Sequence, residues 1–162
     1  MSWLDLGTPA STAGFGYGKC TVVGVFTAAT TPDVALVGQN NQNTDYGWYF
    51  GYSGGSSTTP GISFISVAAT ANLVTNITET IAPGVNTLVA TYDGSLTTAG
   101  VKIYLNGKLG TPGTMRAGSG AQVLETTERL EIGRGEIYAA QQCHNGQIFM
   151  VGGFRKIWTP AE

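Results

Sequence analysis

The sequence has 162 residues, which is enough for one domain with a hydrophobic core. Hydrophobic residues make up 42% of it and charged residues only 11%, well under the roughly one quarter of an average globular protein. Together with 24 glycines and frequent serine and threonine, this composition is typical of an all-β protein, not of a helical or disordered one. The net charge of −2, without a basic cluster, argues against a nucleic-acid partner.

Alternating side chains predict a series of strands in one domain. In Cys20–Thr27, for example, Val22 and Phe26 share one face, and this period of two is typical of a strand with one face on a core. Residues 1–18 are expected to form an arm or an edge strand ahead of a domain over 19–162. The predicted strands are Cys20–Thr27, Val34–Gly38, Tyr46–Tyr52, Ile62–Val67, Leu73–Glu79, Thr87–Tyr92, Val101–Leu105, Arg129–Gly133 and Gln147–Trp158.

Turn signals separate these strands. Gln39–Asp45 is predicted to be a polar loop, because it has no apolar side chain. Asn106-Gly107 is the strongest signal, since this dipeptide accepts the positive φ angles of a two-residue hairpin turn. In the closing strand, the pair Gly152-Gly153 predicts a β-bulge.

Four stretches carry a resemblance to a known family: ATYDGS, then VKIYLNGKL, then LEIGRG, then NGQIFMVGGFRKIWTPAE. They resemble the laminin-G-like members of the concanavalin A-like lectin/glucanase superfamily. The resemblance covers residues 19–162 and implies an all-β, antiparallel two-sheet jelly-roll sandwich. Val85 stands where many relatives have Trp, and Phe149 and Met150 stand where many have an Asp-Glu pair. Apolar residues there predict a covered face, so Phe149 and Met150 are candidate interface residues.

Glycan binding is the first candidate activity, because the family includes lectins. Sugars are bound by flat aromatic faces and by planar amide or carboxylate groups. The loop and strand after Gln39 offer both. The alternative is that the aromatic residues are core and the loop merely turns. The candidate glycan-binding residues are Asn41, Asn43, Asp45, Tyr46 and Trp48.

A calcium site is the second candidate. Many family members hold calcium through loop oxygens, and calcium takes about six to eight oxygen ligands. Asn41, Asn43 and Asp45 are the candidate metal ligands, but a single carboxylate predicts weak Ca²⁺ binding, and no other cofactor is expected. Asp93, in the Tyr-Asp-Gly motif, is expected to bond to its own backbone in a turn.

Catalysis is not supported by the sequence. The Glu-x-Asp-x-x-Glu pattern of the superfamily's glycosidases is absent. Glu125, Glu128 and Glu131 are spaced by three, which on a strand sends neighbours to opposite faces and makes no catalytic pair. His144 follows Cys143 without an evident third orienting group, so we interpret it as a loop histidine.

The two cysteines, Cys20 and Cys143, lie on the first strong strand and in the loop before the last. Because first and last strands are often neighbours in this fold, a disulfide between them is one interpretation. Two reduced thiols are the other.

The low charge leaves few residues to keep strand edges from pairing, so burial in a partner or oligomer is expected. The N-terminus, MSWLDLGTPAS, has no basic region and no apolar region of a secretory signal peptide. Both features favour a non-enzymatic structural module of a virion, such as a phage capsid decoration or tail component, which attaches to virion proteins or to its own copies and adheres to host glycans. The alternative is a carbohydrate-binding adhesion module of a secreted bacterial protein, outside the cell or at its surface. No membrane span is expected.

Overall fold

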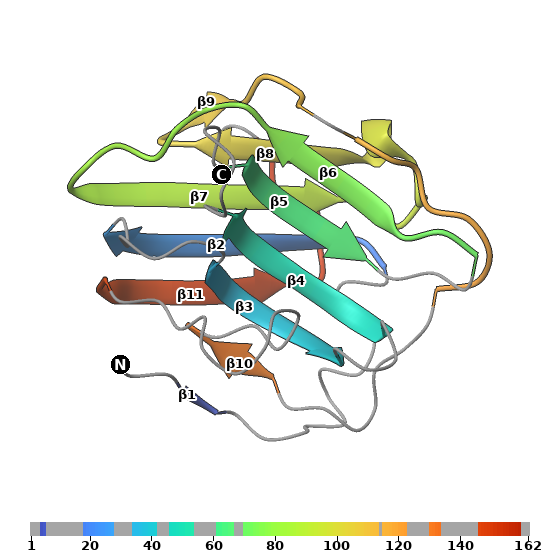
Figure 1. The fold of residues 1–162 in the computed structure, drawn as a ribbon, viewed down its shortest axis with the longest axis horizontal. Coiled ribbons are helices and arrows are strands. Elements are labelled where there is room, and N and C mark those ends of the chain that lie inside the picture. Colours follow the sequence, from blue (N-terminus) through green and yellow to red (C-terminus); the bar gives the residue numbers. More distant parts are fainter. Residues whose placement is uncertain are drawn as a thin grey trace.

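The protein is an all-β sandwich of two antiparallel sheets, and this confirms the predicted jelly-roll class (Figure 1). The computed structural model describes residues 4–5, 18–27, 34–41, 46–53, 61–66, 70–113, 115–122, 130–133 and 146–159. Within these ranges the sole helix is a single 3-10 turn at Thr98–Gly100, and no helix there is long and apolar enough to cross a membrane.

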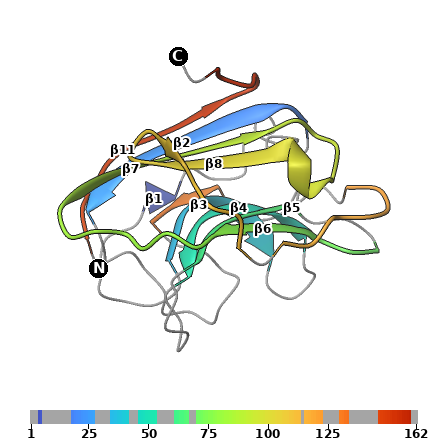
Figure 2. The same cartoon turned by 90° about the horizontal axis from the view of Figure 1, so that it is seen from above.

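The two sheets form two layers, which are seen edge-on in Figure 2. In spatial order, the six-stranded sheet consists of β1 (Leu4–Asp5), β10 (Glu131–Ile132), β3 (Val34–Asn41), β4 (Tyr46–Ser53), β5 (Gly61–Ser66) and β6 (Leu73–Ile77). The five-stranded sheet consists of β11 (Ile148–Phe154), β2 (Cys20–Thr27), β7 (Val85–Tyr92), β8 (Val101–Leu105) and β9 (Lys108–Leu109).

The core lies between the layers and follows from the alternation along each strand. On β2 and β7 the inward side chains include Phe26 and Leu88, and both are fully buried. They meet Leu36 of β3 and Phe50 of β4, which are also fully buried. Burying one such side chain stabilises the fold by about 1.5–3 kcal/mol. Gly24 allows the layers to approach closely, because a Cβ atom there would lie 3.1 Å from Leu36 Cδ1.

The hairpin between β8 and β9 is confirmed in detail. Leu105 pairs with Lys108 across a two-residue turn, in which Asn106 has φ 52° and Gly107 has φ 78°. The Asn106 side chain fixes the turn to β7, because its Oδ1 accepts a hydrogen bond of 2.8 Å from the Thr87 amide.

Several predicted boundaries are wrong. Strand β3 continues through residues 39–41, because Gln39 pairs with Trp48 and Asn41 with Tyr46, so cross-strand pairing extends the strand despite its polar side chains. Within residues 130–133, the described part of the predicted strand Arg129–Gly133, the strand is limited to β10, since there only Glu131 and Ile132 pair with β3.

The predicted bulge in the closing strand is also misplaced. Gly152 and Gly153 keep register with β2, whereas the register shift lies between Ile148 and Met150. A Cβ atom on Gly152 would lie 3.2 Å from the Phe154 ring, so this glycine makes room for an aromatic ring and does not mark a bulge. The strand ends at Phe154 and does not reach Trp158.

Candidate functional site

The five-stranded sheet carries exposed apolar side chains. We call the side of the five-stranded sheet that faces away from the six-stranded sheet the outer face. Among the residues whose side-chain exposure the structure describes, every large exposed apolar side chain comes from the five-stranded sheet or from residues 155–159, the C-terminal segment. These residues are Val85, Leu109, Phe149, Met150, Phe154 and Ile157.

Strand register determines which side chains meet on the outer face. The ladder partners Gly152, Val23, Val89, Tyr104 and Leu109 form one row across all five strands. A neighbouring row contains Phe154, Thr21, Thr91 and Lys102. Lys102 is the one charged residue that these ladders place on the outer face, and the exposed Arg155 and Lys156 of the C-terminal segment add two further cations beside it.

The C-terminal segment turns back over this face, and Figure 2 shows it above the five-stranded sheet. The Thr21 hydroxyl donates a hydrogen bond of 2.7 Å to the Lys156 carbonyl and accepts one of 3.0 Å from the Trp158 amide. The Trp158 ring also packs on Phe154, with centroids 4.3 Å apart and an interplanar angle of 39°. Thr21 and Thr91 are therefore buried although they point outward.

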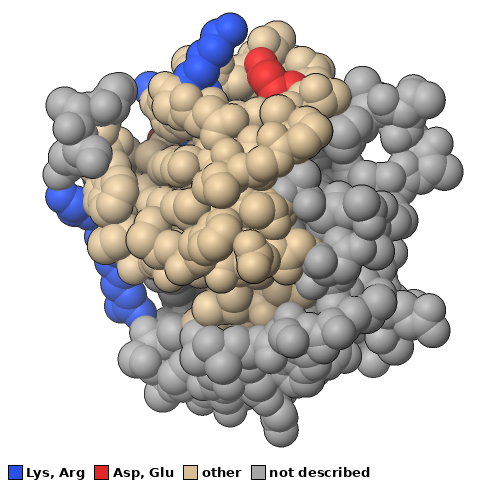
Figure 3. Space-filling model, turned by 90° about the vertical axis from the view of Figure 1, so that its left-hand side faces the viewer, with Lys and Arg blue, Asp and Glu red and all other residues tan. Residues whose placement is uncertain are grey.

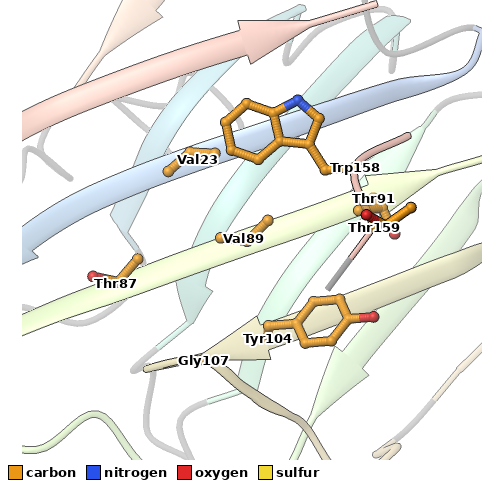
Figure 4. A pocket seen from close by; sticks show the side chains of 8 residues that line it. All are labelled: Val23, Thr87, Val89, Thr91, Tyr104, Gly107, Trp158 and Thr159. Carbon is orange, nitrogen blue, oxygen red and sulfur yellow. The ribbon is translucent and has the colours of Figure 1, made fainter. Parts of the chain in front are cut away.

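This crossing creates a hollow of about 270 Å³ on the outer face, which we call the Trp158–Tyr104 hollow. Figure 4 shows Trp158 and Tyr104 on opposite sides of β7, with Val89 between them. Aromatic rings thus form two walls, valines form the floor, and threonine hydroxyls surround them. No lining residue is charged. The lining residues are Val23, Thr87, Val89, Thr91, Tyr104, Gly107, Trp158 and Thr159.

The sequence analysis did not predict this hollow. Of its two aromatic walls, the sequence contains a signal for one and not for the other. Tyr104 alternates with the inward residues Ile103 and Leu105 of the central hairpin, so its outward direction was readable from the sequence. Nothing local places Trp158 over β2, since its partner Thr21 is 137 residues away.

Of the five residues in the predicted glycan site, the structure describes only the side chain of Trp48. Trp48 is 1% exposed and belongs to the core, where it cannot offer a ring face to a ligand. This corrects its assignment and favours the alternative that the aromatic residues of β4 are core. Asn41 and Tyr46 are register partners at the facing ends of β3 and β4. Their side chains, together with Asn43 and Asp45, lie outside what the structure describes, so these four residues stay predictions.

Most of the metal and catalytic candidates lie outside the described residues. No group of three or more His, Cys, Asp or Glu residues within them could hold a metal ion. Asp93 accepts a hydrogen bond of 2.8 Å from the Ser95 amide through Oδ1, which confirms its predicted role in a turn. Glu131 is 5% exposed on β10. Glu125, Glu128, Cys143 and His144 lie outside the described residues.

The cysteine prediction is tested only in part. Cys20 is buried on β2, and β2 pairs with β11, as expected for first and last strands. Because Cys143 lies outside the described residues, both interpretations of the pair stay open.

The candidate interface residues are accessible. Phe149 is 56% and Met150 48% exposed on β11, which is the edge strand of the five-stranded sheet. Figure 3 shows the end of the molecule to the left of Figure 1, where most of the described surface is uncharged, with basic side chains and an acidic side chain at its margins. The exposed apolar residues of β11 are therefore chemically suited to a protein–protein contact.

Comparisons with known proteins show the fold. No family model and no curated protein matches the chain. A native heptameric SAP-like pentraxin from Limulus polyphemus is similar in structure, with a TM-score of 0.59 and 15% identity over 88% of this chain and 66% of the pentraxin. A Trypanosoma rangeli sialidase in complex with 2,3-difluorosialic acid has a TM-score of 0.57 and 14% identity over 91% of this chain and 22% of the sialidase.

These identities support the jelly-roll sandwich and nothing finer. The chain spans just under two thirds of the pentraxin and about a fifth of the sialidase. The fold is compatible with a concanavalin A-like sandwich, and the laminin-G-like resemblance stays a prediction.

Proposed function

We propose that this chain is a non-enzymatic attachment module on the surface of a virus particle, such as a phage capsid decoration or tail component. It binds neighbouring virion proteins and, in the first place, further copies of itself. The observation that carries the proposal is the apolar edge of the five-stranded sheet, where Phe149 and Met150 are about half exposed on β11. An exposed apolar edge strand favours pairing with another chain, and low charge does nothing to oppose it.

The test is the mass of the purified protein in solution by light scattering, with and without calcium. We expect an oligomer that does not depend on calcium and that Met150→Glu dissociates, because a buried contact would have to desolvate the new charge. Leu109→Glu is the matched control, because Leu109 is 53% exposed on β9 at the opposite edge of the same sheet. A protein that is monomeric at every concentration contradicts self-attachment, and equal dissociation by both variants contradicts the assignment to β11.

A carbohydrate-binding adhesion module, on a virion or in a secreted bacterial protein, is the second candidate. The specific observation in its favour is the Trp158–Tyr104 hollow, which combines two aromatic walls with several hydroxyl groups. A glycan array tests this function as a whole. Two variants then distinguish the sites. Loss of glycan binding in Asp45→Ala indicates the predicted loop site and its weak calcium site, and loss of glycan binding in Tyr104→Ala indicates the hollow.

A further inference from the structure

We infer that the Trp158–Tyr104 hollow binds one neutral pyranose ring, with an apolar face of the sugar against an aromatic wall and its hydroxyls bonded to the surrounding threonines. This inference rests on the carbohydrate-binding candidate above. It places the sugar on the outer face of the five-stranded sheet, away from the predicted loop between β3 and β4.

The floor of the hollow can be recognised only through side chains. Val23 and Val89 are register partners on β2 and β7, and Tyr104 pairs with Val89 from β8. These three strands are interior strands of the sheet, so their backbone groups are used in the ladders. A peptide cannot add to the sheet here as a further strand, because strand addition needs an open edge. The ligand must therefore be recognised by rings and hydroxyl groups.

The walls and hydroxyls match the two kinds of surface on a sugar. An aromatic ring has a negative face, which attracts the polarised C–H groups on the apolar side of a pyranose. Threonine and tyrosine hydroxyls both donate and accept hydrogen bonds, as sugar hydroxyls do. Thr87 and Thr91 lie at the two ends of the floor along β7, with Val89 between them (Figure 4), and Thr87 is the more accessible of the two because Thr91 is only 5% exposed.

Charge and size narrow the ligand class. None of the lining residues is charged, so a sugar carboxylate would lose hydration without gaining a partner. Lys102 is exposed and does not line the hollow, so water screens its charge. A volume of about 270 Å³ falls just below the pockets of about 300 Å³ and more that hold drug-sized ligands. One ring fits this volume, and the rest of a glycan would extend into solvent.

The wall formed by Trp158 is held in place before a ligand arrives. Thr21 fixes the backbone on both sides of Ile157, and Phe154 packs against the Trp158 ring. Such preorganisation lowers the ordering cost of binding. It also means that the hollow is a property of the folded chain alone and needs no partner.

The experiment is an NMR titration of the full chain with the methyl glycosides of glucose, galactose and mannose, up to about 10 mM, because single-ring ligands bind on the order of 1 mM. We expect shifts at the Trp158 indole N–H and at the Val23 and Val89 methyl groups. Tyr104→Ala should weaken binding roughly tenfold. Val85→Ala, which truncates an exposed apolar residue outside the hollow, should leave the affinity unchanged.

A second variant keeps the test valid if Tyr104→Ala does not fold. Val89→Phe fills the hollow with a residue that suits a strand, and it should abolish the shifts while the rest of the spectrum stays native. Sugar-induced shifts that survive Val89→Phe would overturn the inference.

The remaining outcomes separate the inference from the function on which it rests. A positive glycan array with no shift at Trp158 places the sugar elsewhere and removes only the inference. If no sugar binds at all, both the inference and the carbohydrate-binding candidate are wrong. The attachment proposal is tested separately by the mass measurement. Tighter binding of N-acetylneuraminic acid than of the neutral glycosides contradicts a neutral ligand.

Discussion

Replacing Thr21 by valine should release the C-terminal segment from the outer face. Thr21 is fully buried, and its single hydroxyl holds two backbone groups, the Lys156 carbonyl at 2.7 Å and the Trp158 amide at 3.0 Å. Valine has nearly the same shape but can make neither bond. The two backbone groups would then be left without this partner, while the packing of the side chain on β2 would barely change.

The magnitude follows from these two bonds. Each intramolecular hydrogen bond contributes roughly 0.5–1.5 kcal/mol, so the loss amounts to about 1–3 kcal/mol. The methyl group that replaces the hydroxyl offsets up to about 0.8 kcal/mol through apolar burial. The net cost therefore lies between about 0.2 and 3 kcal/mol. Its middle, about 1–2 kcal/mol, corresponds to a fall in Tm of roughly 2–8 °C for a chain of this size. A local opening of the segment would speed exchange of the Trp158 amide by about 5–30-fold.

Hydrogen exchange of the Trp158 amide, measured together with thermal unfolding, is the assay. Thr21→Ser is the matched control, because it removes the methyl group and keeps the hydroxyl. We expect slow exchange in Thr21→Ser, fast exchange in Thr21→Val, and weaker sugar binding only in the latter. If the Trp158 amide exchanges equally in the two variants, the hydroxyl does not hold the segment and this reasoning fails.

Two further predictions concern stability. Partial burial raises the pKa of Glu79, but the Thr111 amide, which donates to Oε1 at 2.7 Å, and the nearby charge of Lys108 outweigh it, so the net pKa lies below its ordinary value of 4.5. A carboxyl group with a lowered pKa stabilises the fold above its unfolded pKa, and this stabilisation is lost as the pH falls through its folded pKa. The Tm should therefore fall as the pH drops below 4.5. In thermal melts, Glu79→Gln should make the Tm depend less on pH in that range. Trp48→Ala should lower the free energy of unfolding by about 3–5 kcal/mol, because it empties a core site. Trp48→Phe should lower the Tm without changing the sugar affinity in the NMR titration. A selective loss of affinity in Trp48→Phe would instead give the Trp48 ring a role in binding.

The parts of the fold that depend on local signals were predictable from the sequence. The Asn106-Gly107 turn and the alternation on β7 and β8 determine the central hairpin, because turn geometry and side-chain period act within a few residues. The extent of β3 was not predictable in this way. Its last residues are polar, and only their pairing with Tyr46 and Trp48 keeps them in the strand.

The candidate site illustrates the same limit. The outward direction of Tyr104 follows from the period of its strand, but a single ring does not define a site. The opposite wall exists because a segment after the last strand crosses to Thr21, near the start of the chain. No periodicity describes such a crossing, and loop and terminal segments are where pattern reasoning is weakest.

One sequence signal nevertheless pointed to the outer face. Strand β2, CTVVGVFT, is apolar on both sides: Val22 and Phe26 face the core, while Val23 and Val25 face outward. Such a pattern is typical of a strand that is covered on both faces. The C-terminal segment covers Thr21 and Val23, which are at most 4% exposed, but it leaves Met150 and Leu109 open at the two edges of the sheet. A partner on β11 would complete the cover at one edge and keep the hollow accessible to a sugar, whereas a partner across the whole sheet would close it. Attachment and adhesion are therefore compatible in one molecule only if the contact stays at the β11 edge.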